Sequence, residues 1–198
     1  MSFETIALPA VILVAITAVI LLAGRDWRLA VSALGAQYVG VFILVALTWP
    51  LEMAVTKLVA GWIAAAVLGM ELVSRPENSL GDERFGRSGS LFRIFAAGLV
   101  GLAVLSFAPD MAKWMLTASY EQILGGLLLI GMGMLHLGMT AHPLRTILGL
   151  LTVFSGFEIL YATVETSALL AGFLAAINLG IALIGAYLLA APILEVEE

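Results

Sequence analysis

Seven stretches of the sequence are each long and apolar enough to cross a lipid bilayer, and this feature constrains the fold most. A transmembrane helix needs about 20 apolar residues. In lipid, every backbone polar group must be paired within the chain, which favours helices. We therefore predict an all-α integral membrane protein with about seven transmembrane helices, at residues 5–24, 29–49, 51–73, 91–108, 121–141, 145–164 and 166–191.

The breaks between these stretches contain charge or proline. They are RDWR (25–28), TWPLE (48–52), the long polar loop 74–90, APD (108–110) and AHPLR (141–145). We expect APD to end the fourth helix. The turn between the last two helices, near Glu165, is the least defined boundary.

Composition narrows the possible chemistry. Hydrophobic residues make up 62% of the chain and charged residues 12%, whereas soluble domains have about 25% charged residues. The absence of Cys excludes disulfides, thiolate metal sites and Cys-ligated iron–sulfur clusters, so redox chemistry would belong to a partner. No nucleotide-binding or HExxH motif is present, and we expect no cofactor and no metal. The N-terminus lacks a basic region before its apolar run, so we expect the first span to be retained.

The basic residues predict the orientation. With seven spans, one side receives only Lys113, and the other receives Arg25, Arg28, Arg75, Arg84, Arg87, Arg93 and Arg145. Cytoplasmic loops carry an excess of Lys and Arg. We therefore expect the N-terminus outside and the acidic C-terminal EVEE inside.

Two segments of the sequence resemble each other. LVAGWIAAAVLGMEL (58–72) and LLAGFLAAINLGIAL (169–183) share eight of fifteen residues, and YVGVFIL (38–44) is a weaker echo of FSGFEIL (154–160). Apolar helices also resemble one another by chance. If the duplication is real, two three-helix units in the same orientation need one extra helix between them, as in parallel repeats related by an axis along the membrane normal.

This repeat gives the expected division of the chain. It comprises an N-terminal three-helix repeat (1–73), a cytoplasmic loop (74–90), a linking helix with an outer loop (91–120) and a C-terminal three-helix unit with a short acidic tail (121–198).

A carboxylate, Glu158, stands in VFSGFEILYATVE (153–165), which is otherwise suited to lipid. A charge at membrane depth costs at least about 2.5 kcal/mol even on lenient insertion scales, so a retained one indicates function. Glu158 lies about seven residues from the outer end of its span near Glu165, and Lys57 lies six residues after Leu51. Both are therefore about 10 Å inside the outer boundary. A Glu158–Lys57 pair could handle protons, because moving one proton changes the field at the other group.

Two other interpretations of these residues remain open. The pair could serve only to orient two helices. Alternatively, Lys57 could extend outward to the headgroups while Glu158 is protonated and hydrogen-bonded to a neighbour.

Further polar residues share the predicted spans. Thr152, Ser155, Glu158 and Tyr161 (or Thr163) fall at helical spacing and predict a polar stripe that faces protein or water. The same stripe is compatible with tight helix packing through Ser and Thr.

Three more polar residues are candidates for a proton path. Asn178 could extend a hydrogen-bonded path from Glu158 or act only between helices. His136 could relay a proton, because imidazole titrates near neutral pH. Gln37 is a minor candidate.

The C-terminal third carries a family resemblance. Residues 123–191 resemble the three-helix NuoK-type subunit of respiratory complex I and the C subunit of Mrp sodium/proton antiporters. A glycine-rich helix leads through a basic turn to Leu-Gly-Leu (148–150), and GFEIL (156–160) echoes the family's Gly-Leu-Glu-Ile. With RLAVSALGAQYVG (28–40) and AVTKLVAGW (54–62), the chain looks most similar to the E component of hydrogenase-4, the longer NuoK-like subunit of group 4 membrane hydrogenases.

The resemblance implies that Glu158 corresponds to the family's buried proton-path Glu. An alignment anchored on Leu-Gly-Leu would place that Glu near residue 151 instead. The second intramembrane Glu of complex I is represented here by Asn178 or a neighbour.

The implied function is that of a non-catalytic, cofactor-free subunit in a multisubunit complex of a bacterial or archaeal cell membrane. Its partners would be antiporter-like membrane subunits and a peripheral redox module, and it would contribute to proton or sodium translocation. Glu158 would exchange protons, Lys57 would modulate it, and His136, Tyr161 and Asn178 would relay protons or hold water. A purely structural subunit of a membrane redox complex is the alternative, and a small autonomous transporter is a third interpretation.

Overall fold

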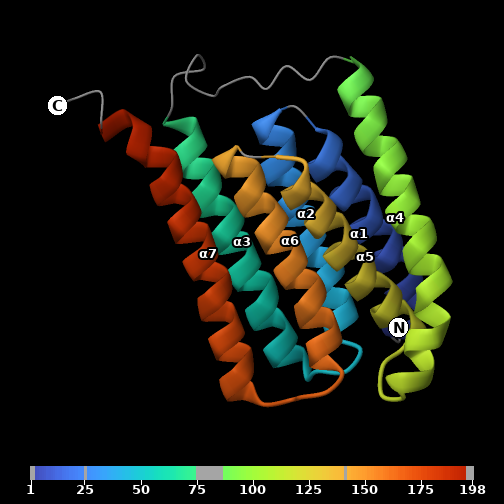
Figure 1. Ribbon diagram of the computed structural model, residues 1–198. Coiled ribbons are helices and arrows are strands. Elements are labelled where there is room, and N and C mark those ends of the chain that lie inside the picture. Colours follow the sequence, from blue (N-terminus) through green and yellow to red (C-terminus); the bar gives the residue numbers. More distant parts are fainter. Residues whose placement is uncertain (1–2, 25, 75–86, 141, 195–198) are drawn as a thin grey trace.

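The computed structural model describes residues 3–24, 26–74, 87–140 and 142–194. Within these ranges the chain forms seven helices (Figure 1). They are α1 (Phe3–Ala23), α2 (Trp27–Val45), α3 (Leu51–Val73), α4 (Arg87–Trp114), α5 (Tyr120–Gly138), α6 (Pro143–Ala162) and α7 (Ala168–Leu194). All seven are long and apolar enough to cross a membrane. The predicted all-α class with seven spans is thereby confirmed.

The prediction that APD ends the fourth helix was wrong. The helix α4 continues through Pro109 and ends at Trp114. Proline removes one backbone donor and normally kinks or ends a helix, but helices in apolar surroundings tolerate it where neighbouring groups satisfy the freed carbonyl. The second span was predicted to end at residue 49, but α2 ends at Val45. Residues 46–49 form the connection to α3 instead.

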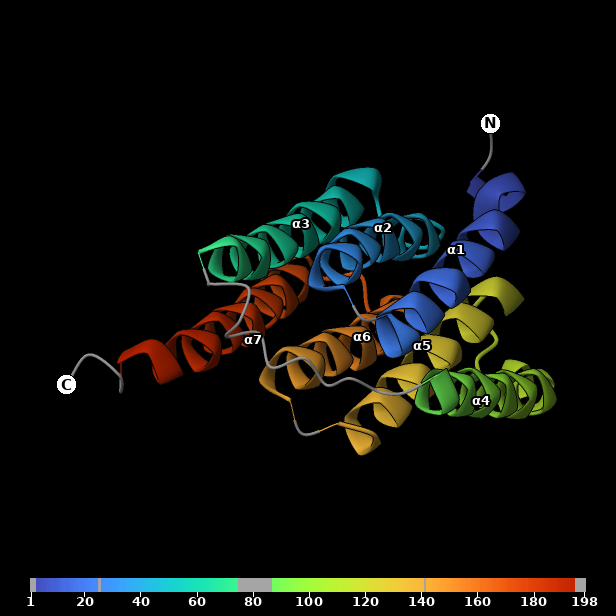
Figure 2. The ribbon, with the colours of Figure 1, turned by 90° about the horizontal axis from the view of Figure 1, so that it is seen from above.

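The helices form two rows that face each other. Seen from above, α1, α2 and α3 make one row and α5, α6 and α7 the other, in the same order (Figure 2). Each helix packs on its neighbour within the row, and α1 packs on α5, α2 on α6 and α3 on α7 across the rows. The helix α4 lies beside α5 and α1 at one end of this arrangement. Both rows rise, descend and rise again along the chain (Figure 1).

The order of the rows differs from the one expected for an axial repeat. A twofold axis along the membrane normal would bring α1 opposite α7 and α3 opposite α5, whereas the packed pairs are α1–α5 and α3–α7. The two rows are therefore related by a sideways displacement. The gene-level duplication stays a prediction.

Within the second row, α5 and α6 are held together by close backbone contact. A Cβ on Gly156 would lie 2.6 Å from the carbonyl oxygen of Gly126, and one on Gly133 would lie 2.9 Å from that of Gly149. Small residues at such positions let helices approach closely in a membrane, where packing replaces the hydrophobic effect. This contact fixes the position of α6, which carries the polar stripe.

Apart from Lys57, the described basic side chains lie at the ends of the helices, with Lys113 at one end and the arginines at the other, as predicted. Arg93 Nη1 donates to the Leu22 carbonyl at 2.9 Å and Arg145 Nη2 to the Gly24 carbonyl at 2.9 Å, both at the C-terminal end of α1. Arg28 lies at the same end, in the first turn of α2. We call this the Arg end.

Lys113 marks the other end of the helices. It lies in the last turn of α4, where its Nζ contacts Asp110 Oδ1 at 2.6 Å. We call this the Lys113 end. The predicted loop arginines Arg25, Arg75 and Arg84 and the EVEE tail lie outside the described residues, as does the side chain of Arg87.

Candidate functional site

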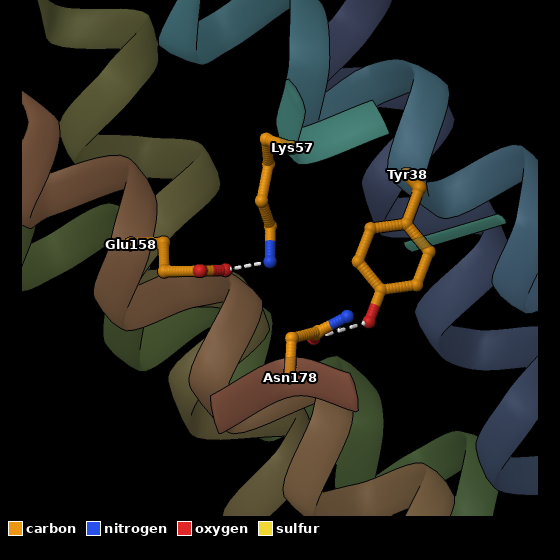
Figure 3. A network of polar contacts seen from close by, with 4 residues as sticks. All are labelled: Tyr38, Lys57, Glu158 and Asn178. Carbon is orange, nitrogen blue, oxygen red and sulfur yellow. Dashed lines mark hydrogen bonds and ion pairs between the residues drawn. The ribbon is translucent and has the colours of Figure 1, made fainter. Parts of the chain in front are cut away.

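A buried ion pair joins α3 to α6. Lys57 Nζ contacts Glu158 Oε2, and the two side chains are only 5% and 2% exposed (Figure 3). Lys57 lies six residues after Leu51, the first residue of α3, and Glu158 four residues before Ala162, the last of α6. The pair therefore lies about 6–9 Å inside the helix ends at the Lys113 end. Lys57 and Glu158 were expected to lie at the same depth, and in the structure they contact each other. Lys57 therefore points to Glu158 and not outward to the headgroups.

A second polar pair lies beside the first. The Tyr38 hydroxyl on α2 donates to Asn178 Oδ1 on α7 at 2.8 Å, and both side chains are fully buried. Figure 3 shows the four side chains converging from four separate helices. Asn178 thus lies beside the ion pair, and its partner is Tyr38 on another helix rather than Glu158.

The two pairs cross each other. The helices α2, α3, α6 and α7 stand at the corners of a square, in which α2–α3, α3–α7, α6–α7 and α2–α6 are the packed edges. The Lys57–Glu158 pair spans the α3–α6 diagonal and the Tyr38–Asn178 pair spans the α2–α7 diagonal. Side chains therefore connect helices that lie diagonally opposite each other. We call these four residues the crossed pairs.

The Lys57 ammonium also has aromatic neighbours. It lies 5.1 Å from the centre of the Tyr38 ring and 5.5 Å from that of Phe154. A cation within about 6 Å of a ring centre is attracted to its face, by about 2 kcal/mol or more when desolvated. The lysine charge is thus stabilised from two sides besides that of the carboxylate.

Several polar atoms around the crossed pairs have no hydrogen-bond partner within the protein. Apart from Lys57 Nζ and Glu158 Oε2, which contact each other, they are Glu158 Oε1, Ser155 Oγ, Asn178 Nδ2 and Gln37 Oε1. Buried polar groups in proteins are almost always satisfied by protein or by ordered water. These atoms are therefore the positions at which ordered water would bind in the core.

The polar stripe of α6 extends this core toward the middle of the protein. Thr152, Ser155 and Glu158 are all buried, at spacings of three residues. The Gln37 amide approaches Thr152 Oγ1 at 3.5 Å, and that hydroxyl donates to the Leu148 carbonyl at 2.8 Å. Ser155 lies near the Tyr38 hydroxyl without a hydrogen bond of standard geometry. These three members of the predicted stripe face protein.

Two predicted path residues are not brought to this core. Tyr161 is partly exposed and stacks on Phe157 at 5.5 Å, on another face of α6. Thr163, the alternative to it, is buried but returns its hydroxyl to the Leu160 carbonyl of its own helix.

His136, like Tyr161, was predicted to belong to the proton path but lies away from the crossed pairs. It is buried in α5, ten residues beyond Gly126, which packs on Gly156 at about the level of Glu158. That separation amounts to about 15 Å along the helix axis. His136 therefore lies toward the Arg end and away from the crossed pairs.

The sequence interpretation missed Tyr38. A tyrosine in an apolar span passes for a core aromatic residue, and only its neighbour Gln37 was considered. The signal was present in the weaker internal echo, which aligns Tyr38 of YVGVFIL with Phe154 of FSGFEIL. These two rings are the ones that flank the Lys57 ammonium.

Gly61 makes room for the Tyr38 ring, and its replacement by Ala should disturb the site. A Cβ there would lie 2.2 Å from ring atoms of Tyr38. Shifting the ring breaks its bond to Asn178 and should destabilise the protein by about 1–3 kcal/mol, which outweighs the roughly 1 kcal/mol of helix propensity that Ala gains over Gly. Thermal unfolding in detergent measures this.

The repeat supplies a matched control for that substitution. Gly172 aligns with Gly61 in the sequence, yet a Cβ on Gly172 would meet nothing within 4 Å. We expect Gly172→Ala to leave the melting temperature unchanged or slightly raised. Equal effects of the two substitutions would contradict the close packing of Tyr38 on Gly61.

We also looked for metal-binding clusters among the described residues and for similarity to known proteins. Among the described residues, no group of three or more His, Cys, Asp or Glu side chains could hold a metal ion. A family-model scan, a search of curated proteins and a search of solved structures each gave no match to the chain.

Proposed function

We propose that this chain is a cofactor-free, non-catalytic membrane subunit of a multisubunit ion-pumping complex. Such complexes include complex I, group 4 membrane hydrogenases and Mrp antiporters, which the sequence resembles. Its contribution is proton translocation coupled to redox chemistry in partner subunits. The observation that carries the proposal is the buried Lys57–Glu158 pair at the centre of four helices.

Stability alone is a poor reason to keep such a pair. Desolvating two charges costs several kcal/mol per ion, and replacing a buried ion pair with well-packed apolar residues is often neutral or stabilising. A chain whose only task is packing would be served as well by apolar side chains. Intramembrane ionisable residues are accordingly functional candidates by default.

The chemistry that the pair supports is reversible protonation of a carboxylate. When Glu158 takes up a proton, the core changes from a neutral ion pair to a single positive charge on Lys57. The faces of the Tyr38 and Phe154 rings stabilise that charge by cation–π contact. When Glu158 releases the proton, the ion pair forms again.

Coupling to other subunits would be electrostatic. A charge that moves in a neighbouring subunit alters the proton affinity of Glu158, because opposite and like charges act on a carboxylate with opposite sign. Ser155, Asn178 and Gln37 would hold the water molecules through which the proton travels. His136 and Tyr161 have no contact with this core, and a role for them would involve a separate step.

The orientation is part of the proposal. The Arg end would be cytoplasmic and the Lys113 end external, because Lys and Arg are enriched in cytoplasmic loops. The first helix begins at the Lys113 end, so the N-terminus would be outside and the C-terminus cytoplasmic. The membrane would be the cell membrane of a bacterium or archaeon.

A structural role is the second candidate, and the crossed pairs favour it. They connect α2 with α7 and α3 with α6, which lie diagonally opposite each other. In this interpretation the chain packs against a membrane redox complex, and its polar residues only fix the helix arrangement.

Affinity purification tests membership in a complex. A tag is placed at the C-terminus, native membranes are extracted in mild detergent, and stoichiometric partners are identified by mass spectrometry. We expect antiporter-like membrane subunits together with a redox module. A chain that purifies alone, or only with copies of itself, would contradict the proposal.

A further inference from the structure

We propose that water reaches the crossed pairs from the Lys113 end of the membrane and not from the Arg end, so that a translocated proton would pass to the other side through a partner subunit, and that Trp49 closes the route to the Lys113 end. The inference depends on the proposed function only in naming the proton as the exchanging species. The accessible side and the closing residue follow from packing at the two ends of the four-helix group.

A layer of apolar side chains separates the site from the Arg end. Thr152 lies nine residues after Pro143, the first residue of α6, so about 13 Å of helix lies between the polar stripe and that end. The space is filled by one cluster of side chains that are at most 7% exposed: Leu34, Leu68, Leu72, Leu144, Ile147, Leu148 and Leu189. They come from all four helices of the square. Such packing leaves no room for a continuous file of water molecules.

The layer toward the Lys113 end is thinner. Only four residues follow Glu158 in α6 and six precede Lys57 in α3, which is about 6–9 Å. The buried residues in these two segments are Ala54, Ile159 and Ala162, and the start of α7 adds Ala171 and Leu174. A layer this short, with three alanines in it, is a weaker barrier than the longer layer at the Arg end.

One hydrogen bond crosses this thin layer at its outer edge. The indole Nε1 of Trp49, in the turn between α2 and α3, donates to the carbonyl of Glu165, between α6 and α7, at 2.8 Å. These two turns join the same four helices that carry the crossed pairs. Trp49 is 6% exposed and belongs to the buried cluster that contains Ala54, Ala162 and Ala171. Its ring therefore covers the outer end of the four-helix group.

The test uses the fact that the chain contains no Cys. Ser155→Cys places a thiol of nearly the same size in the core. Silver ions, which are small and need a water path, are applied in chloride-free medium to sealed vesicles of both orientations. Occupied thiols are then read out by their failure to react with a maleimide after denaturation. Native membranes are used, so that any partner subunits stay in place.

We expect Ser155→Cys to react from the Lys113 end and to be protected from the Arg end. Adding Trp49→Phe keeps an aromatic ring but removes the indole donor. Loss of one hydrogen bond should raise the reaction rate about fivefold. Reaction from the Arg end at an equal or greater rate, or from neither end, would overturn the proposal. An unchanged or slower rate with Trp49→Phe would overturn the role of Trp49.

Three control variants make the result interpretable. Thr117→Cys and Ser74→Cys are exposed at the Lys113 end and the Arg end, and they report vesicle orientation. Ala65→Cys lies in the apolar layer and should stay unreactive from the Arg end; its reaction there would also overturn the proposal. If Ser155→Cys does not fold, Asn178→Cys serves as the core reporter, with the same outcomes.

These results separate the inference from the proposed function. Silver labelling measures water access to the core and does not require pumping. Access from the wrong end would reject the inference while leaving the ion-pumping complex possible. Failure to purify with partners would reject the complex while leaving the access route intact.

Discussion

Glu158→Gln is expected to abolish coupled proton movement while the complex still assembles. The substitution keeps the size of the side chain and a carbonyl oxygen for Lys57, but it removes the exchangeable proton. The rings of Tyr38 and Phe154 continue to stabilise the lysine charge. Proton uptake by vesicles containing the purified complex, measured with a pH-sensitive dye during redox turnover, gives the result.

The matched control for this substitution is Glu52→Gln, in the first turn of the same helix that carries Lys57. Glu52 is exposed, so the same chemical change there should leave pumping unaltered. Unchanged pumping by Glu158→Gln would reject the carboxylate as the exchanging group. Loss of the assembled complex would instead support the structural interpretation.

Lys57→Met is expected to have the largest effect on stability. It leaves the Glu158 carboxylate buried without a cation, and breaking a buried ion pair in this way costs about 3–5 kcal/mol. The double variant Lys57→Met with Glu158→Leu removes both charges and should recover most of that stability. Thermal unfolding of the detergent-extracted complex, with the amount of assembled complex as a second measure, compares the variants.

The double variant also distinguishes the two functional interpretations. If the pair handles protons, the double variant should assemble but fail to pump. If the pair serves only to position helices, a well-packed apolar replacement should restore both assembly and pumping. Full pumping by an assembled double variant would therefore reject the proposed role of the pair.

Hydropathy was sufficient to predict the spans, because a helix in lipid must be both apolar and about 20 residues long. The limits of α3 were predicted to the residue, since Pro50 and the polar loop interrupt the apolar stretch on both sides. The end of α4 was not, because the effect of Pro109 depends on whether neighbouring groups compensate for the lost backbone bond. The order of the rows could not be predicted, because repeat similarity does not distinguish rotation from displacement.

The sequence predicted the depth of the candidate site residues in the membrane. It did not predict which neighbouring helix each side chain faces. Counting residues placed Lys57 and Glu158 at one level, while helix packing decided that they face each other. Tyr161 follows Glu158 by three residues, yet it lies on the side of α6 where Phe157 is exposed. Tyr38 was overlooked because its hydroxyl matters only in the presence of Asn178 on a distant helix.

The crossed pairs have a mechanical consequence. Four helices connected along both diagonals resist distortion of the square in either direction. If one diagonal contact is lost, the two helices that it joined can move apart while the other two stay connected. Protonation of Glu158 would weaken the connection between α3 and α6 and leave the Tyr38–Asn178 bond between α2 and α7 in place. A change of one charge would then favour movement of α3 and α6 along one direction in the plane of the membrane.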